Sequence, residues 1–416
     1  MTLPLTHKVG LSLRQTINFF IKLAVLVLFA VSIVSAMPYE EWNRTYGNAL
    51  SSIADVKAVD DGFILAGFTG STYDSDAWII RTDAQGNEVW NVTFGGGEID
   101  VASSIQKVAD GYIIAGLYGG AFGDGWLVKI DFNGNLLWSK TYGGRDYERF
   151  WWVEVVDDGF VIAGEKKSWG KPSDAWLVKT DFEGNVVWSR TYGGEGDDAA
   201  LCVRKVEDGF IIAGFTESFS AKDAWLLKVD SEGNEVWNAT FGGGLDDSFS
   251  SVQVITDGFI LAGYTQSIQG KKDALVIKVD KTGREVWNAT FGGKRDDEAS
   301  AVIPVSDGYV IAGFTESFTE SFGADRDGWL IKINRSGNVV WNVTFGGKGR
   351  ESFSSIVKTS DGYALAGSKE GRGWLVRVVE GELTEEVKST PGFEVPAAVT
   401  ALVITLMWLT RHKPKI

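Results

Sequence analysis

Residues 101–144 read VASSIQKVADGYIIAGLYGGAFGDGWLVKIDFNGNLLWSKTYGG and form one copy of a unit, about fifty residues long, that recurs along the chain. Asp110-Gly111 is predicted to form a tight hairpin turn, because Asp and Gly accept left-handed backbone conformations, and Asp131 to Asn135 a second one. No segment repeats with the helical period of about 3.6 residues, so the unit is predicted to be all-β. Its four strands, here called a, b, c and d, are expected at 102–108, 112–117, 126–131 and 136–142.

Two marks of this unit each occur seven times, but they are offset at the two ends of the chain. The first Trp segment precedes any complete unit, and the last unit has no Trp segment after it. One mark is an Asp-Gly-aromatic turn before an apolar run, at Asp61, Asp110, Asp158, Asp208, Asp257, Asp307 and Asp361. The other is a Trp followed by two residues, Thr, an aromatic residue and Gly, at Trp42, Trp90, Trp138, Trp188, Trp237, Trp287 and Trp341.

This offset predicts a closed ring. Four antiparallel strands per unit, with strand b apolar on both faces and therefore buried on both, predict a seven-bladed β-propeller. Residues 40–47 supply a strand d with nothing before it, and residues 352–379 supply strands a, b and c with no d. We expect the N-terminal strand to pair with strand c near Trp374 and to complete the last blade. A linear solenoid would need atypical capping repeats, and none is found.

The N-terminal segment, residues 1–36, is predicted to be a secretory signal peptide or an N-terminal anchor. Lys8, Arg14 and Lys22 precede an apolar stretch at 23–34, which ends in the small residues around Ala36. The stretch is short for a bilayer span, which needs about 20 residues, and this favours cleavage.

The C-terminal segment has three parts. Residues 384–394 form a short linker that contains Pro391-Gly392-Phe393, and residues 395–416 are predicted to form a hydrophobic transmembrane or sorting helix with a basic tail. This layout resembles the PGF-CTERM sorting signal of archaeal surface proteins. The resemblance implies that a sorting transpeptidase of the archaeosortase type removes the tail and attaches the protein to a lipid. The predicted fold class thus includes a hydrophobic helix at each terminus, and the predicted location is the outer face of the cell membrane, anchored in it.

A recurring turn, Asp-x-x-Gly-x-x-x-Trp, runs for example from Asp131 to Trp138 and from Asp181 to Trp188. It resembles the tryptophan-docking repeat of PQQ-like (quinoprotein-like) propellers, and the resemblance covers residues 38–380. It implies one propeller domain at 37–383. Enzymes of that family usually have eight blades and a cofactor on the axis. This chain has seven blades and no recognisable cofactor residues, so no cofactor is expected.

Composition excludes several function classes. The net charge of −15 argues against a nucleic-acid surface, which needs a basic footprint. Cys202 is the only cysteine, so no intrachain disulfide can form. His7 and His412 both lie outside the repeats, so the repeat body cannot use Ser-His-Asp or Cys-His catalysis or a His-ligated metal. We assign no catalytic residues, and it stays open whether the protein is an enzyme.

Two recurring patterns of charged residues are interpreted first as contacts that hold the repeat together. A basic residue follows each strand-c Trp by three positions, and an acid usually comes two positions later, as in Lys129 and Asp131. Because side chains alternate between the two faces of a strand, the two residues are expected on the same face and are predicted to form a structural ion pair. Ten residues after the strand-d Trp, six of the seven blades carry an acid. A ring of carboxylates could bind Ca²⁺ or a cationic ligand, and turn capping is the alternative. The acids of this ring are Asp100, Glu148, Asp198, Asp247, Asp297 and Glu351.

Blade three breaks the repeat most strongly. It has Phe150-Trp151-Trp152 on strand a, where other blades have Ser-Ser or Ser-Ala, and Trp169 in the loop between strands b and c. Aromatic side chains with flanking charges could stack on a sugar or hold a peptide. Alternatively, they could simply plug the channel. The candidate ligand-binding residues are Glu148, Arg149, Trp151, Trp152 and Trp169.

Six Asn-x-Ser/Thr sequences predict N-glycosylation in an exported chain. Five of the six directly follow a strand-d Trp, where strand d is expected to be outermost and the Asn could face solvent. The alternative is a β-favouring Trp-Asn-x-Thr strand without sugar. The six asparagines are Asn43, Asn91, Asn238, Asn288, Asn334 and Asn342.

These features favour a cell-surface-anchored propeller that binds a glycan or an envelope protein. One alternative is an extracellular enzyme, either PQQ-like or a carboxylate-based glycan-processing enzyme. Another is a purely structural envelope component. The expected partners are the membrane, a glycan or envelope protein, and the sorting transpeptidase, and no nucleic acid.

Overall fold

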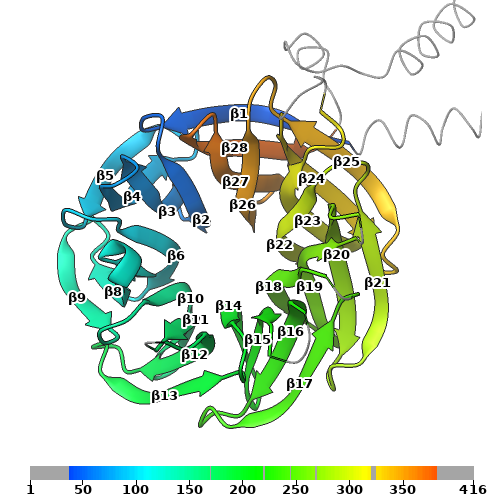
Figure 1. Ribbon diagram of the computed structural model, residues 1–416. Helices are drawn as coiled ribbons and strands as arrows, with labels where there is room; N and C mark the ends of the chain where they lie inside the picture. The colour runs from blue at the N-terminus through cyan, green and yellow to red at the C-terminus, as the bar shows by residue number, and fades with distance from the viewer. Residues whose placement is uncertain are drawn as a thin grey trace, which may run out of the picture. The chain divides into compact units, whose positions relative to one another are not determined.

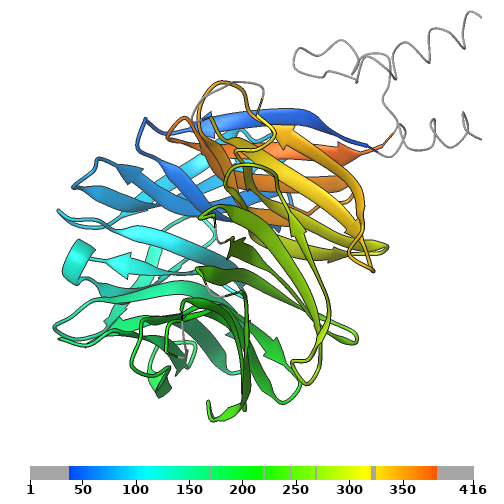
Figure 2. The ribbon, with the colours of Figure 1, turned by 45° about the vertical axis from the view of Figure 1, so that its right-hand side comes forward.

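The computed structural model describes residues 37–168, 170–218, 221–243, 245–267, 269–319 and 325–381. These residues form seven four-stranded antiparallel sheets, arranged as blades around a central channel (Figure 1). The described chain is therefore an all-β, seven-bladed propeller. Figure 2 shows the same ring turned by 45° about the vertical axis.

The strands keep the same order in every blade. Strands a line the channel: β2 (Ser52–Val59), β6 (Val101–Val108), β10 (Glu148–Val156), β14 (Asp198–Val206), β18 (Asp247–Ile255), β22 (Asp297–Val305) and β26 (Glu351–Lys358). Strands b are β3 (Gly62–Gly70), β7 (Gly111–Tyr118), β11 (Gly159–Lys167), β15 (Gly209–Thr216), β19 (Gly258–Gln266), β23 (Gly308–Thr315) and β27 (Gly362–Lys369). Strands c are β4 (Ser75–Asp83), β8 (Asp124–Ile130), β12 (Ser173–Thr180), β16 (Asp223–Val229), β20 (Lys272–Asp280), β24 (Asp327–Asn334) and β28 (Arg372–Glu380). Strands d form the rim: β1 (Pro38–Tyr46), β5 (Glu88–Phe94), β9 (Leu136–Tyr142), β13 (Val186–Tyr192), β17 (Glu235–Phe241), β21 (Glu285–Phe291) and β25 (Val339–Phe345).

Blade seven is built from both ends of the described chain. Its strand order is β1-β28-β27-β26, so the N-terminal strand is its outer strand. β1 also contacts blade one, because Tyr46 Oη donates to the carbonyl of Gly86 at 2.6 Å and the ring of Trp42 meets Phe63 edge-on. The predicted closing strand at 40–47 differs from β1 by one or two residues at each end.

The predicted fold class was wrong in one respect, the hydrophobic helix at each terminus. Among the described residues the helical structure is a single 3-10 turn, Gly120–Phe122, and none of their helices is long and apolar enough to cross a membrane. The described chain begins and ends in the sheet of blade seven, because β1 and β28 pair with each other there. The predicted signal peptide, linker and C-terminal segment lie outside the described residues.

The hydrophobic core lies between successive blades. For example, Ile64 and Ile79 of blade one pack against Ile105 and Ile114 of blade two. Six consecutive residues of β3, starting at Gly62, are buried, because a neighbouring blade covers each face of the strand. The continuous apolar runs of strand b therefore have the environment that their composition predicts.

The recurring Trp of strand d contacts the next blade. A Cβ on Gly86, in the turn between strands c and d of blade one, would lie only 2.5 Å from the ring of Trp42. Gly86 also has a φ of 74°, so glycine is required for both reasons. The Asp-x-x-Gly-x-x-x-Trp pattern thus joins each blade to its neighbour. The same contact joins Trp90 to Gly134, Trp138 to Gly184, Trp188 to Gly233, Trp237 to Gly283 and Trp287 to Gly337.

The predicted ion pair between Lys129 and Asp131 was wrong, because Lys129 has a different partner in the structure. Lys129 Nζ lies 2.9 Å from Asp110, in the hairpin turn between strands a and b. Asp131 instead caps its own turn, since its Oδ1 accepts the N–H groups of Asn133 and Asn135, both at 2.8 Å. The register shifts directly after Lys129, so simple alternation does not continue to Asp131. The same pairing recurs in Lys179–Asp158, Lys228–Asp208, Lys278–Asp257 and Lys332–Asp307, and in Arg81–Asp61 and Arg377–Asp361.

Candidate functional site

The two faces of the ring carry different loops. The turns between strands a and b and between strands c and d lie on one face, here called the lower face. The loops between strands b and c and between strand d and the next strand a lie on the upper face. The upper ends of the inner strands surround the mouth of the channel, and Arg149 and Trp151 of blade three lie there.

A stacked group in blade three contains two of the predicted ligand-binding residues. The guanidinium of Arg149 lies over the ring of Trp151, 3.6 Å from its centroid, and Trp151 Nε1 donates to Glu165 Oε1 at 3.3 Å. The register of β10 shifts between Phe150 and Trp152, so Trp151 is the bulged residue and leaves the core. Phe150 stays fully buried and stacks on Trp176.

Glu165 is the member of this group that the sequence did not identify. It pairs with Arg149 across β10 and β11, at a position that is Phe215, Tyr264 or Phe314 in the next three blades. Burial raises its pKa above the ordinary range, and the Arg149 guanidinium partly opposes this. A single carboxylate at a position that is aromatic in four of the other six blades is the sequence signal that could have revealed it.

The arrangement continues over the next three blades. In each of these blades a cation lies over an aromatic ring. The distances to the ring centroid are 3.8 Å for Lys222 over Phe215, 3.7 Å for Lys272 over Tyr264 and 3.6 Å for Arg326 over Phe314. We call these three pairs, together with Arg149 and Trp151, the mouth arc. Flat aromatic faces beside charged groups suit a polar ligand such as a sugar.

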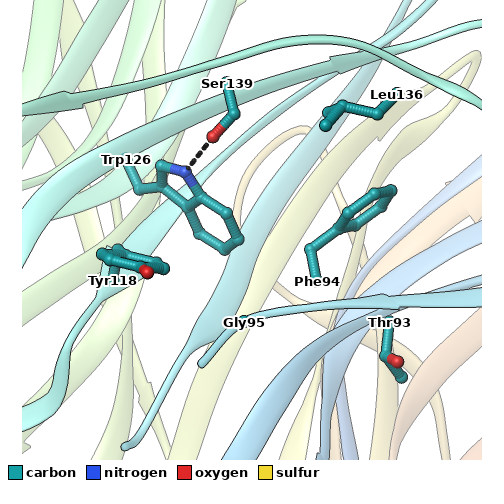
Figure 3. A pocket seen from close by; sticks show the side chains of 7 residues that line it. All are labelled: Thr93, Phe94, Gly95, Tyr118, Trp126, Leu136 and Ser139. Carbon is teal, nitrogen blue, oxygen red and sulfur yellow. Dashed lines mark hydrogen bonds between the residues drawn. The ribbon is translucent and has the colours of Figure 1, made fainter. Parts of the chain in front are cut away.

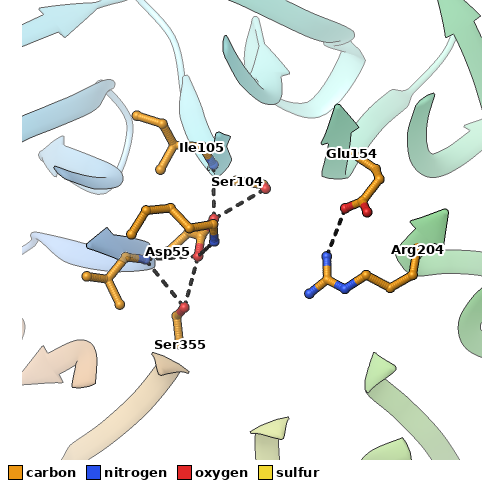
Figure 4. Close-up of polar contacts among 8 residues, drawn as sticks. Asp55, Ser104, Ile105, Glu154, Arg204 and Ser355 are labelled. Atoms are coloured by element: carbon orange, nitrogen blue, oxygen red, sulfur yellow. Dashed lines mark hydrogen bonds and ion pairs between the residues drawn. The ribbon is translucent and has the colours of Figure 1, made fainter. Parts of the chain in front are cut away.

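Trp152 lies in the channel, apart from the stacked group. Lys57 Nζ of blade one is 5.0 Å from its ring centroid, and the guanidinium of Arg204 in blade four is 4.2 Å away. Arg204 also pairs with Glu154 at 3.1 Å (Figure 4). Trp152 thus lies between two cations from different blades, and its ring also packs against two hydrophobic core clusters.

Opposite this pair, Asp55 links three blades. Its carboxylate is 1% exposed and accepts hydrogen bonds from Lys57 Nζ at 2.6 Å, from the N–H of Ile105 at 3.0 Å and from Ser355 Oγ at 2.9 Å (Figure 4). Ser104 Oγ is a further donor at 3.3 Å. These contacts join blade one to blades two and seven, beside the blade that closes the ring.

The six acids of the predicted carboxylate ring are all buried. Five of the six accept an N–H of the loop before their strand, as Asp198 shows: its Oδ2 accepts the N–H of Gly194 at 3.0 Å and the hydroxyl of Ser218 at 2.6 Å. The equivalent N–H groups of Gly96, Gly144, Gly243 and Gly293 bind Asp100, Glu148, Asp247 and Asp297. These contacts are those of turn capping. Within the described ranges, no group of three or more His, Cys, Asp or Glu side chains could hold a metal ion.

Glu148, the first residue of β10, therefore binds the loop before its strand and not the stacked group. It is 2% exposed, it accepts the N–H of Gly144, and Lys166 Nζ is 3.6 Å from its Oε1. Of the five predicted ligand-binding residues, Arg149 and Trp151 lie together, Glu148 and Trp152 lie elsewhere, and Trp169 is outside the described residues.

A cavity of about 310 Å³ lies in the groove between blades one and two (Figure 3). Phe94, Tyr118 and Trp126 form its walls, and Trp126 Nε1 donates to Ser139 Oγ at 2.7 Å. Tyr118 also borders a second cavity of about 280 Å³ that Asp100 lines. Both are close to the lower size limit of small-molecule sites, and repeated scaffold residues line them.

The predicted glycosylation sites differ in their surroundings. Asn91 Oδ1 accepts from Trp78 Nε1 at 3.2 Å, and Ser139 plays the same part for Trp126 in blade two. Asn334 caps a turn by accepting the N–H of Ser336 at 2.9 Å. Asn342 is exposed, and its side chain makes no hydrogen bond to the described residues.

Comparison with known proteins identifies no family for this chain. No protein-family model matches the sequence, and no curated protein matches it. Among solved structures, the crystal structure of Sqt1 from Chaetomium thermophilum is similar with a TM-score of 0.48 and 11% identity. The match covers 84% of this chain and 99% of that one.

Proposed function

We propose that this propeller is an interaction module at the outer face of the cell membrane, which binds a glycan or an envelope protein through the upper mouth of its channel. The observation that carries this proposal is the stacked group in blade three. Trp151 replaces a small or apolar residue of the other blades, Arg149 is the only cation at its position and Glu165 the only carboxylate at its own. Their polar and aromatic atoms meet at the mouth. The β-propeller fold is typically used for interaction, which supports the same reading.

Binding through this group is tested by substitution in the full-length chain. We expect Trp151→Ala to weaken binding to the glycan or envelope protein by at least about tenfold, since a central aromatic contact commonly contributes that much. A glycan array and affinity capture from an envelope extract would identify the ligand, and titration would measure the change. The matched control is Leu201→Ala, which alters the same bulged position in blade four. Equal binding by the Trp151 and Leu201 variants would contradict the proposal.

A glycan-processing enzyme is the second candidate, and Glu165 is the observation that favours it. Burial raises the pKa of Glu165, as a carboxyl group that acts as a general acid requires, and the charge of Asp197 adds to the shift. The variant Glu165→Gln separates the two functions. Release of new reducing ends by the unmodified chain, lost in Glu165→Gln while binding is retained, would favour the enzyme.

The surface location and the glycans belong to the same proposal. The apolar segments at 23–34 and 395–409 and the resemblance of the C-terminus to a sorting signal support membrane anchoring. Among the six sequons, we expect a glycan first at Asn342, because its amide is exposed and free. Intact-mass measurement and peptide mapping of native protein would detect it. A peptide with unmodified Asn342, alongside glycans at Asn91 or Asn334, would contradict this order.

A further inference from the structure

Pairs of carboxylates from successive blades meet at four seams of the ring. At the seam between blades six and seven, Asp327 Oδ1 and Glu351 Oε2 lie 2.3 and 2.9 Å from the point where a Cβ would stand on Gly346. At the seam between blades five and six, Asp273 and Asp297 lie 2.3 and 2.7 Å from the same point on Gly292. Asp76 with Asp100, at Gly95, and Asp124 with Glu148, at Gly143, repeat the arrangement.

At the blade-seven seam, Asp327 Oδ1 accepts the N–H of Gly347 at 3.2 Å, whereas Glu351 lacks a donor. Glu351 is 0% exposed, and neither of its carboxylate oxygens has a hydrogen-bond partner. At the seam between blades two and three, Asp124 Oδ1 is likewise buried without a hydrogen-bond partner. A buried charged oxygen without a partner is costly, so a ligand is expected there. The charged groups that face Glu351 are Asp327, Lys369 and Glu370.

The ligand that two carboxylates can hold by themselves is a proton. Two neighbouring carboxylates in a poorly solvated place cannot both ionise easily, and one then keeps its proton. Burial, followed by the facing acid, raises the pKa of Asp273. At Glu148 and Glu351 burial also has the largest effect, the facing acid adds to it, and Lys166 and Lys369 oppose it. The pKa of Asp100 is raised as well, where Asp76 and Glu98 add to the effect of burial.

We propose that the seams at Gly346 and Gly143 are proton-binding sites, each of which holds one proton between two carboxylates and thereby joins neighbouring blades. The bound proton turns one carboxylate into a donor for the other and removes the repulsion across the seam. At the other two seams, N–H and hydroxyl donors already bind Asp100 and Asp297.

The sign of the pH dependence follows from this arrangement. A carboxyl group whose pKa is higher in the folded state stabilises the fold below its unfolded pKa, and the stabilisation is lost as pH rises through the folded pKa. The lower-face acids Asp208 and Asp257 behave oppositely, because hydrogen bonds from Lys228 and Lys278 lower their pKa. The stability that Asp208 and Asp257 contribute to the fold is lost only when pH falls below the ordinary range of carboxyl pKa values. The ring is therefore expected to be most stable at mildly acidic pH.

The test compares full-length variants by thermal unfolding at pH 5 and pH 7.5. Glu351→Gln and Asp124→Asn imitate the protonated acids, and we expect each to raise Tm at pH 7.5 by about 2 °C or more and to change it less at pH 5. The matched control, Asp257→Asn, removes the partner of Lys278 and should lower Tm at pH 7.5. Seam variants that lower Tm as the control does would overturn the proposal.

The unmodified chain provides a second test that does not depend on a variant folding. Its Tm is expected to fall between pH 5 and pH 7, and unfolding near pH 6 should release protons into unbuffered solution. A Tm that is flat or rises over this range, or proton uptake on unfolding, would overturn the proposal.

Discussion

Deleting residues 38–46 is expected to lower the Tm of the whole ring by roughly 10 °C or more, although it removes only β1. The strand completes blade seven, and its loss exposes the edge of β28 along its length. It also removes Tyr46, which is 8% exposed and donates to Gly86, together with the packing of Trp42 on blade one. Thermal unfolding followed by circular dichroism would measure the effect.

A rescue variant distinguishes ring closure from a general loss of residues. In it, the sequence of β1 is placed after Glu380 and joined through the turn sequence of residues 181–185. In the other blades strand d follows strand c through such a turn, so the moved strand can reach its place from the other side. We expect most of the lost Tm to return. A deletion variant with unchanged Tm, or a rescue variant no more stable than the deletion, would contradict closure by β1.

Replacing Asp55 with alanine is expected to lower the free energy of unfolding by about 3–5 kcal/mol, because removing one partner of a buried ion pair leaves the other charge uncompensated. Lys57 would lose its partner, and the N–H of Ile105 and the hydroxyl of Ser355 would lose their acceptor inside the channel. Chemical denaturation would measure the difference.

Two further variants test the reason for this cost. Ser251→Ala alters the same strand position in blade five, where no charge is paired, and should cost about 1 kcal/mol or less. In Asp55→Ser with Lys57→Met the unpaired charge is gone, so part of the loss should be recovered. A double variant as unstable as Asp55→Ala would show that the ion pair is not the cause.

The stacked group at the mouth shows what comparison of the seven repeats can predict and what it cannot. Trp151 stands out because most other blades have a small residue at its position, and Arg149 because it is the only cation at its own. Trp152 stands out equally, yet it lies in the channel between Lys57 and Arg204. The bulge at Trp151 separates them, and a shift of one residue on a strand changes the side to which each side chain points.

The sequence by itself determined the ring. The Asp-Gly hairpins, the apolar strands and the offset of the Trp segments are local signals, and each blade is a local structure, so their repetition predicts seven blades and the place of closure. Only the tertiary structure decided which charges meet. Lys129 pairs with Asp110 and not with Asp131, and Glu351 faces Asp327 from the preceding blade. Such contacts join residues on different strands or blades, and they depend on strand register and bulges that composition and spacing do not specify.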